Sequence, residues 1–222
     1  MRASVTRDLL LFTGQGSSSH FTDSATFDGL LLQLGEPDRE AYHTFADTCL
    51  KAFRSELQSL DQNEQSIFEN VKLNVFNAFN TSRALLLPPQ SYQSHPIIET
   101  ISLYLRHILE LFVYQSRQSG ENIVVETAGL CTGVLPAILS SSFTAYNTSE
   151  FISAATQGFR LAFWIGLRSA LYAKQKAGKE WQASSWVLGV FGLTVEALED
   201  KIESYNNGSV SLGVFFSLNT SY

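Results

Sequence analysis

Residues 121–141 read "ENIVVETAGLCTGVLPAILSS" and place one cysteine between two glycines, after an apolar run and before a second one. The run "ENIVVE" has the length and the β-branched content of a buried strand. "CTGVLPAILSS" is typical of a helix, and a proline near its first turn is tolerated there. This order of strand, turn and helix predicts an α/β fold. Cys131 is then either a packed thiol in a glycine turn or a nucleophile at the end of a strand.

The glycine spacing favours a nucleophile. Gly129, Cys131 and Gly133 form the pattern G-x-C-x-G, the thiol counterpart of the G-x-S-x-G nucleophile elbow. A nucleophile at such a turn has a strained backbone, and side chains two residues to either side would clash with the strand and the helix. The N-terminus of the following helix would favour a thiolate. We expect such a thiolate to accept an acyl group from a thioester.

A second glycine turn lies near the start of the chain, where "DLLLF" (8–12), a short buried strand, runs into "TGQGSSS". A dinucleotide fingerprint would need a third glycine where Ser19 stands, and no P-loop is present. A glycine turn can also bring a backbone N–H close to a developing oxyanion. We expect the N–H groups of Gln15 and Thr132 to form this hole. The glycines of the two turns would line the substrate site: Gly14, Gly16, Gly129 and Gly133.

Helical periodicity accounts for most of the remaining chain. An apolar face from Tyr42 to Leu57 places Cys49 in the core. Asp61 and Glu64 form a capping-box pattern for a helix that we expect to continue to Phe79, before the loop "LLLPPQSYQSHP". Pro96 opens a helix expected to be covered on more than one side. "NTSE" (147–150) predicts the cap of a long helix through Gln175.

The character of the sequence changes near residue 184. "SWVLGVFG", "LTVEALEDKIESYNN" and "GSVSLGVFFSLN" read as strand, helix and strand. We therefore predict a large unit over 1–183 and the beginning of a smaller one over 184–222.

Composition excludes several functional classes. The 222 residues are 45% hydrophobic, enough for a sizeable core, and carry a net charge of −6, which offers no basic surface for nucleic acid. No signal peptide or membrane-spanning run is evident, and two cysteines are too few for a disulfide framework. We expect a cytoplasmic protein with no bound cofactor, no metal and no nucleic-acid or membrane partner.

Five segments, in order and spacing, resemble the starter-unit acyltransferase (SAT) domain at the N-terminus of fungal non-reducing polyketide synthases: "LLFTGQGSSSHF", "HPIIETISLYLRHILEL", "GLCTGVLPA", "LAFWIGLRSAL" and "SWVLGVFGLTVEALEDKIESYN". The resemblance covers almost the whole chain. More distantly it reaches the malonyl-CoA:acyl-carrier-protein transacylases, whose motif is Gly-His-Ser-x-Gly. Leu130 stands here for that histidine and Cys131 for the serine.

The resemblance implies a FabD-like acyltransferase fold: the first part of an α/β-hydrolase-like large subdomain, then the beginning of a ferredoxin-like small subdomain. It also implies a transferase. Cys131 would take an acyl starter from acyl-CoA or a fatty acid synthase and pass it to the phosphopantetheine thiol of an acyl carrier protein.

Two departures qualify this expectation. The general base of the family is a histidine downstream of the nucleophile, whereas all four histidines here precede Cys131: His20, His43, His95 and His107. We therefore expect no unaided turnover. A non-catalytic truncated remnant or interaction module stays open, as does an α/β-hydrolase-type thiol hydrolase, which would need a late acidic residue and histidine.

The second departure is Trp164, where the family usually has an arginine. Arg160 and Arg168 lie about one turn to either side, so no arginine can be assigned the role of pairing a substrate carboxylate. Unsubstituted acyl groups are therefore favoured over malonyl-type substrates, which the resemblance to the starter-unit domain also implies. A basic cluster on and after this helix could meet a carrier protein or CoA phosphates, although lysines at a helix end are typically solvated. The cluster comprises Arg160, Arg168, Lys174, Lys176 and Lys179.

Overall fold

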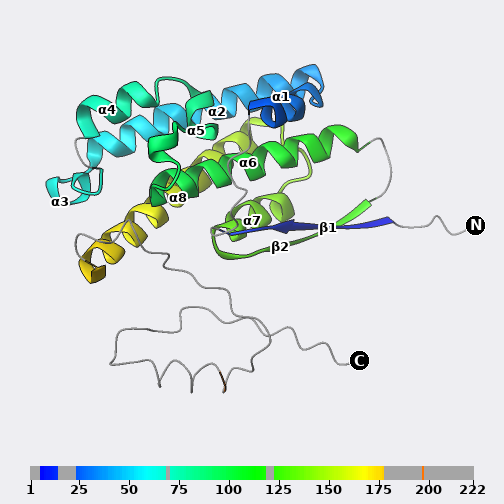
Figure 1. Cartoon of the computed structure of the whole chain (residues 1–222). Coiled ribbons are helices and arrows are strands. Elements are labelled where there is room, and N and C mark those ends of the chain that lie inside the picture. The colour runs from blue at the N-terminus through cyan, green and yellow to red at the C-terminus, as the bar shows by residue number, and fades with distance from the viewer. Residues whose placement is uncertain (1–5, 15–23, 69–70, 119–122, 178–196, 198–222) are drawn as a thin grey trace, which may run out of the picture. The chain divides into compact units, whose positions relative to one another are not determined.

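A computed structural model describes residues 6–14, 24–68, 71–118, 123–177 and 197 (Figure 1). The chain divides into two compact units, Met1–Ser184 and Ser185–Tyr222. All helices and strands given below belong to the first unit. The small subdomain that the sequence predicts over 184–222 lies outside the described residues, apart from Ala197.

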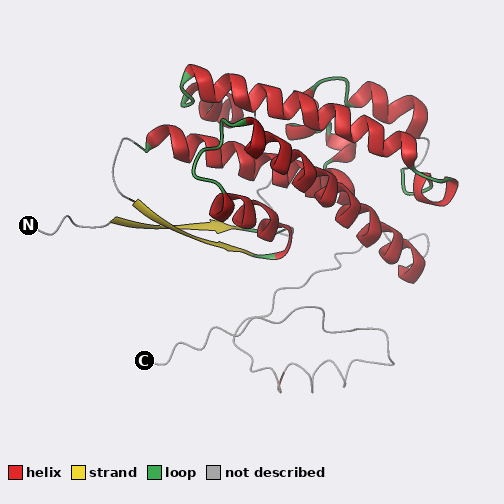
Figure 2. Ribbon diagram, turned by 180° about the vertical axis from the view of Figure 1, so that it is seen from behind, coloured by secondary structure: helices red, strands yellow, loops and turns green. Residues whose placement is uncertain are grey.

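Two strands far apart in the sequence pair in parallel. β1 (Thr6–Phe12) and β2 (Ile123–Gly129) run in register from Thr6 opposite Ile123 to Phe12 opposite Gly129. Both strands therefore end at the same edge, where each continues into one of the two glycine turns. α7 (Val134–Ser142) packs on one face of this sheet, and the other helices lie on that same side (Figure 2).

The two strands exist as predicted, but the prediction that both are buried is wrong. Leu9 and Leu11 of β1 are 58% and 68% exposed, and Val124 of β2 is 46% exposed. Alternate residues of a strand point to opposite faces, so these side chains share the sheet face away from α7. The apolar composition of the two strands predicts that helices pack on both faces of the sheet, as in most parallel sheets. In the described residues, helices pack on one face only.

Three long helices form the core. α2 (Glu36–Ser59), α6 (Pro96–Arg117) and α8 (Ser149–Ala177) pack against one another, with the shorter α1 (Ser24–Leu32) alongside α6. Cys49 of α2 is fully buried, as its place on the apolar face predicts. Pro96 occupies the first turn of α6, and the off-stripe Leu103 and Leu111 are both buried, which confirms cover on several sides.

Gly166 explains how closely α6 and α8 approach. A Cβ at this position would lie 2.8 Å from the Cα atom of Ile97 at the start of α6. The missing side chain lets the two helices meet at this point.

The helix predicted from Asp61 to Phe79 is broken. The capping box exists, because Glu64 N–H donates to Asp61 and Asp61 N–H donates back to Glu64, but α3 (Gln62–Gln65) then ends. Ser66 Oγ donates to the Asn63 carbonyl, and the consecutive Ile67 and Phe68 are both buried. Three short segments follow: α4 (Val71–Ala78), α5 (Ser82–Leu86) and the 3-10 turn η1 (Gln90–Tyr92). The last two occupy part of the sequence expected as a loop.

The start of α8 differs by one residue from the predicted cap. Thr148 Oγ1, not Asn147, accepts the hydrogen bond from Phe151 N–H. Asn147 instead donates to Asp38 at the start of α2 and ties the two helix ends together.

The fold is a mostly helical α/β architecture with a small parallel sheet. Among the described helices, none combines the length and the apolar content needed to cross a bilayer.

Candidate active site

Cys131 sits at the elbow that follows β2. It opens the 3-10 turn η2 (Cys131–Gly133), which leads directly into α7. Its φ of +56° is the one positive value among the described non-glycine residues, and its side chain is exposed. A non-glycine residue in this left-handed region is strained, and such residues concentrate at functional sites.

The two flanking glycines are required by close backbone contacts. A Cβ at Gly129 would collide with the carbonyl oxygen of Gly133. A Cβ at Gly133 would collide with the Phe12 carbonyl and lie 2.7 Å from the Thr13 oxygen. The strand-to-helix turn therefore closes only if both positions lack side chains.

The first glycine turn meets the elbow. Leu130 N–H donates to the carbonyl of Phe12, the last residue of β1, at 2.9 Å. A Cβ at Gly14 would lie 2.5 Å from Cys131 Cβ, so Gly14 presents bare backbone to the cysteine. Gln15 and Gly16, which the sequence also assigns to the site, lie outside the described residues.

Thr132, the other expected oxyanion donor, directly follows the cysteine. Its residue is 4% exposed, and its hydroxyl oxygen is buried without a hydrogen-bond partner in the described part of the chain. Its backbone N–H belongs to the first turn leading into α7, where amide groups have no carbonyl four residues earlier to bond.

Three of the four histidines can be placed, and among the described residues none bonds to Cys131. His43 is exposed on α2, and His95 stacks on Phe68 with ring centroids 4.5 Å apart. Burial lowers the pKa of His95 to about 4, against a raising effect of the Ile67 backbone. His107 contacts Thr13, next to the site. His20 lies outside the described residues.

His107 is the residue that the sequence reasoning undervalued. His107 follows Tyr104 by three residues and precedes Leu111 by four, and both of these residues are buried in α6. This helical spacing alone would have indicated a histidine in the core. Nothing in the sequence shows that this face meets the end of β1, about a hundred positions away along the chain.

The arginines beside Trp164 are both paired. Arg160 bonds to Glu56 of α2, and Trp164 Nε1–H donates to the second oxygen of the same carboxylate at 3.0 Å. Arg168 Nη2 lies 3.2 Å from Glu64 Oε1. Trp164 thus contributes to a buried polar contact between α2 and α8.

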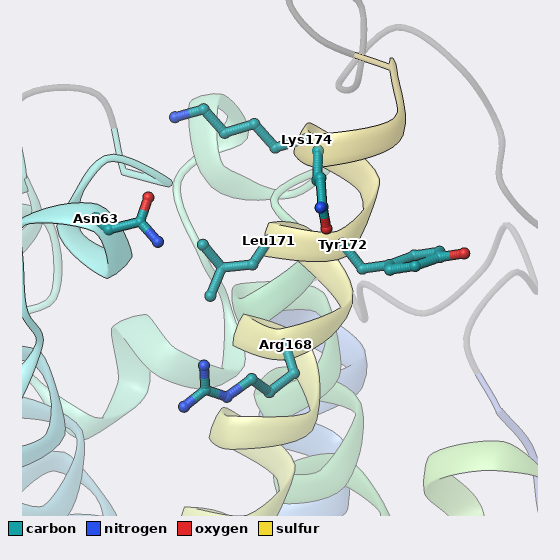
Figure 3. Close-up of a pocket in the computed structure, with 6 residues that line it drawn as sticks. Asn63, Arg168, Leu171, Tyr172 and Lys174 are labelled. Carbon is teal, nitrogen blue, oxygen red and sulfur yellow. The ribbon is translucent and has the colours of Figure 1, made fainter.

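A hollow of about 610 Å³ lies at the C-terminal end of α8, lined by Asn63, Arg168, Leu171, Tyr172, Lys174 and Gln175. Arg168, Leu171 and Lys174 extend toward Asn63 of α3, while Tyr172 leaves the opposite side of α8 (Figure 3). Lys174 already bonds to the Ser66 carbonyl at 2.9 Å, and Lys176 lies over the Tyr172 ring. Neither Cys131 nor its neighbours line this hollow. Lys179 lies outside the described residues.

Cys131 is the candidate nucleophile of this site. Within the described ranges no group of three His, Cys, Asp or Glu side chains could hold a metal ion. Burial raises the pKa of the Cys49 thiol well above its usual value, although Thr156 and Arg160 act to lower it. Cys49 is thus inert, while Cys131 offers an exposed thiol at a strained elbow.

Comparison with known proteins gives one family. The profile described as "Starter unit:ACP transacylase in aflatoxin biosynthesis" matches residues 16–211. The orsellinic acid synthase ArmB of Armillaria ostoyae is 29% identical over 173 residues, which is 72% of this chain and 8% of that protein. The orsellinic acid synthase of Beauveria bassiana is 26% identical over 211 residues, 90% of this chain and 9% of that protein. The matched region thus spans less than a tenth of the length of each of these relatives. No solved structure matches with comparable significance.

Proposed function

The chain belongs to the starter unit:ACP transacylase family, and from this membership we propose that Cys131 carries the acyl-thioester intermediate of a starter-unit transfer in polyketide biosynthesis. The observation that supports this role is the elbow itself. Cys131 has positive φ, an exposed thiol and bare glycine backbone against it. A packed structural cysteine would need none of these features.

The proposed transfer has two balanced steps. The Cys131 thiolate attacks the carbonyl carbon of an acyl-CoA thioester, the bond from that carbon to the CoA sulfur breaks, and the CoA thiolate leaves and takes up a proton. The phosphopantetheine thiol of a carrier protein then loses its proton and attacks the acyl-cysteine, which releases Cys131. One thioester replaces another, so the protein mainly supplies position and charge stabilisation.

Each step passes through a tetrahedral oxyanion. We assign its stabilisation to the backbone N–H groups of Gln15 and Thr132, with Gly14, Gly16, Gly129 and Gly133 leaving room for the substrate. Support comes from the approach of Gly14 to Cys131 and from the place of Thr132 at the start of the turn into α7. Two such donors are typical of acyl-transfer sites.

We propose unsubstituted acyl groups as the substrates, because neither arginine beside Trp164 is available to bind a substrate carboxylate. A malonyl-type substrate carries a free carboxylate, which an unpaired arginine would bind bidentately. Arg160 and Arg168 are instead held by Glu56 and Glu64. We further propose that the donor is an acyl-CoA or a fatty acid synthase and that the acceptor is an acyl carrier protein. We place this transfer in the cytoplasm.

The 222-residue sequence has no histidine after Cys131. Deprotonation of the thiol would therefore depend on the solvent or on a base supplied from elsewhere, and we propose slow transfer at neutral pH. At higher pH, solvent hydroxide replaces the base.

The test is acylation of the intact protein by acetyl-CoA and octanoyl-CoA at pH 7.0 and 8.5, followed by intact mass and peptide mapping. We expect one acyl group on Cys131 at pH 8.5. Cys131→Ala should stay unmodified, and Cys49→Ala should behave as the parent protein. Malonyl-CoA should react more slowly than acetyl-CoA.

The rival functions give other outcomes. No adduct on Cys131 at either pH would refute the proposal, and binding of a carrier protein by such an inert chain would indicate an interaction module. Continuous CoA release without a carrier protein would indicate a thiol hydrolase. Rapid carrier acylation at pH 7.0 would refute only the need for an external base.

A further inference from the structure

His107 connects the core of α6 to the edge of the candidate site. The imidazole is buried, and its Nε2 lies 3.0 Å from the carbonyl oxygen of Thr13. The ring also meets Phe12 edge-on, with centroids 5.4 Å apart and planes at 85°. Phe12 ends β1, and Thr13 leads to Gly14, which touches Cys131. One side chain thus holds both residues that precede the glycine.

The Thr13 contact fixes a peptide plane. The described chain has no cis peptide bond, and in a trans peptide the C=O and the following N–H point in opposite directions. When the Thr13 oxygen faces His107, the Gly14 N–H must point away from α6. The same contact therefore sets the direction in which the backbone passes Cys131.

From this geometry we propose that His107 is a positioning residue for acyl transfer at Cys131: its Nε2–H holds the Thr13 carbonyl so that Gly14 stays against the cysteine. The proposal rests on the proposed function of Cys131. His107 touches neither the cysteine nor, on this account, the substrate. It acts through the main chain of Thr13 and Gly14.

The proton on Nε2 follows from its partner. A carbonyl oxygen only accepts hydrogen bonds, so Nε2 must donate. Nδ1 lies 3.3 Å from Glu110 Oε2, and Arg106 Nε lies 3.0 Å from the other oxygen of that carboxylate. Burial acts to raise the pKa of Glu110, but the hydrogen bonds from His107 and Arg106 outweigh it and lower the pKa. Glu110 thus stays a carboxylate that faces the other ring nitrogen.

These two contacts also separate positioning from base catalysis. With Nε2 on Thr13 and Nδ1 facing Glu110, both ring nitrogens are directed at partners other than the Cys131 thiol. A base role would require the ring to leave both partners and rotate within a packed helix face.

The test compares two reactions of the same thiol. Alkylation by iodoacetamide displaces iodide at a saturated carbon and forms no oxyanion, whereas acylation by acetyl-CoA does. Both rates are measured at pH 8.5 by intact mass for the parent protein, His107→Leu and His107→Gln. His43→Leu, which changes an exposed histidine of α2, is the matched control.

Loss of one oxyanion donor typically costs about 10²–10³-fold in rate, so a misplaced loop should cost at least about tenfold. We expect His107→Leu to acylate at least about tenfold more slowly while its alkylation changes less than about twofold. His107→Gln retains a donor for the Thr13 carbonyl and should recover most of the acylation rate. Equal acylation by parent and His107→Leu, or a parallel fall of both reactions in a folded protein, would overturn the proposal.

A second readout does not depend on acyl transfer. Amide hydrogen exchange of peptides that contain Thr13 and Gly14 should become faster in His107→Leu and stay at the parent rate in His107→Gln. If the parent protein is not acylated, the proposed function fails, and unchanged exchange in His107→Leu would separately overturn the positioning role. His107→Met, with a flexible side chain, replaces His107→Leu if the latter does not fold.

Discussion

The strain at Cys131 can be measured by asking whether glycine is better than alanine at this position. At an ordinary position glycine is worse, because it loses more backbone freedom on folding, by about 0.5–1 kcal/mol. At a φ of +56° alanine carries the left-handed penalty of about 1–2 kcal/mol that glycine avoids. Cys131→Gly should therefore be more stable than Cys131→Ala, by about 0.5–1 kcal/mol.

Leu130 provides the matched pair. It is also exposed but has a φ of −108°, so Leu130→Gly should be less stable than Leu130→Ala by about 0.5–1 kcal/mol. The entropy of glycine is common to both pairs. When the Gly-minus-Ala difference in unfolding free energy at position 130 is subtracted from that at position 131, the glycine entropy cancels. The remainder is the left-handed penalty alone, about 1–2 kcal/mol.

The assay is equilibrium unfolding of all four variants in urea, monitored by circular dichroism. For a chain of this size a difference of 1 kcal/mol corresponds to about 2–4 °C in Tm, which a thermal scan resolves. If glycine is the worse residue at both positions by the same amount, Cys131 is unstrained and the reasoning from its backbone to an elbow is refuted.

Three further results are expected. Gly133→Ala should cost about 3 kcal/mol or more in unfolding free energy, because its Cβ meets main chain that cannot move aside, whereas Gly29→Ala in open helix surface should gain up to about 1 kcal/mol. Trp164→Phe should cost about 1.5–3 kcal/mol, measured in urea, through loss of the hydrogen bond to the Glu56 carboxylate. His95 has a folded-state pKa of about 4 against 6.5 when unfolded, so the unfolded chain binds more protons below pH 6.5. The free energy of unfolding should therefore fall by about 3 kcal/mol between pH 6.5 and 4. His95→Phe should show a smaller fall over the same range.

Each of these results has a control or a contradicting outcome. Tolerance of Gly133→Ala would mean that the elbow can open. For Trp164→Phe the comparison is Tyr172→Phe, at an exposed ring on the same helix, which should change stability by less than about 0.5 kcal/mol. If the free energy of unfolding of His95→Phe falls as steeply below pH 6.5 as that of the parent protein, groups other than His95 cause the pH dependence.

Local geometry is the part of the molecule that the sequence predicted best. The glycines around Cys131 act over five residues, and the reason for them, close approach of main chain, is the same in the pattern and in the structure. The capping box at Asp61 and the proline at the start of α6 are equally local. Such features depend on neighbours in sequence, which a pattern contains.

The misses involve partners distant in sequence. Leu9 and Leu11 have the composition of a strand covered on both faces, but composition does not say which element covers a face. The break after Gln65 comes from Ile67 and Phe68 entering the core together. The contact of His107 with Thr13 requires β1 and α6 to meet, which no local pattern around His107 contains.

The close approaches around Cys131 have a consequence for how such a site can change. At Gly14, Gly129 and Gly133 the atoms nearest to an added side chain are main-chain atoms and the Cβ atom of Cys131. The backbone around Cys131 is therefore set by these glycines and not by the nature of the nucleophilic atom. A serine oxygen would lie closer to Cβ than the sulfur does, because a C–O bond is shorter than a C–S bond, but it would leave these main-chain contacts in place. The choice of nucleophile is therefore open to a single codon change, while the scaffold around it is not.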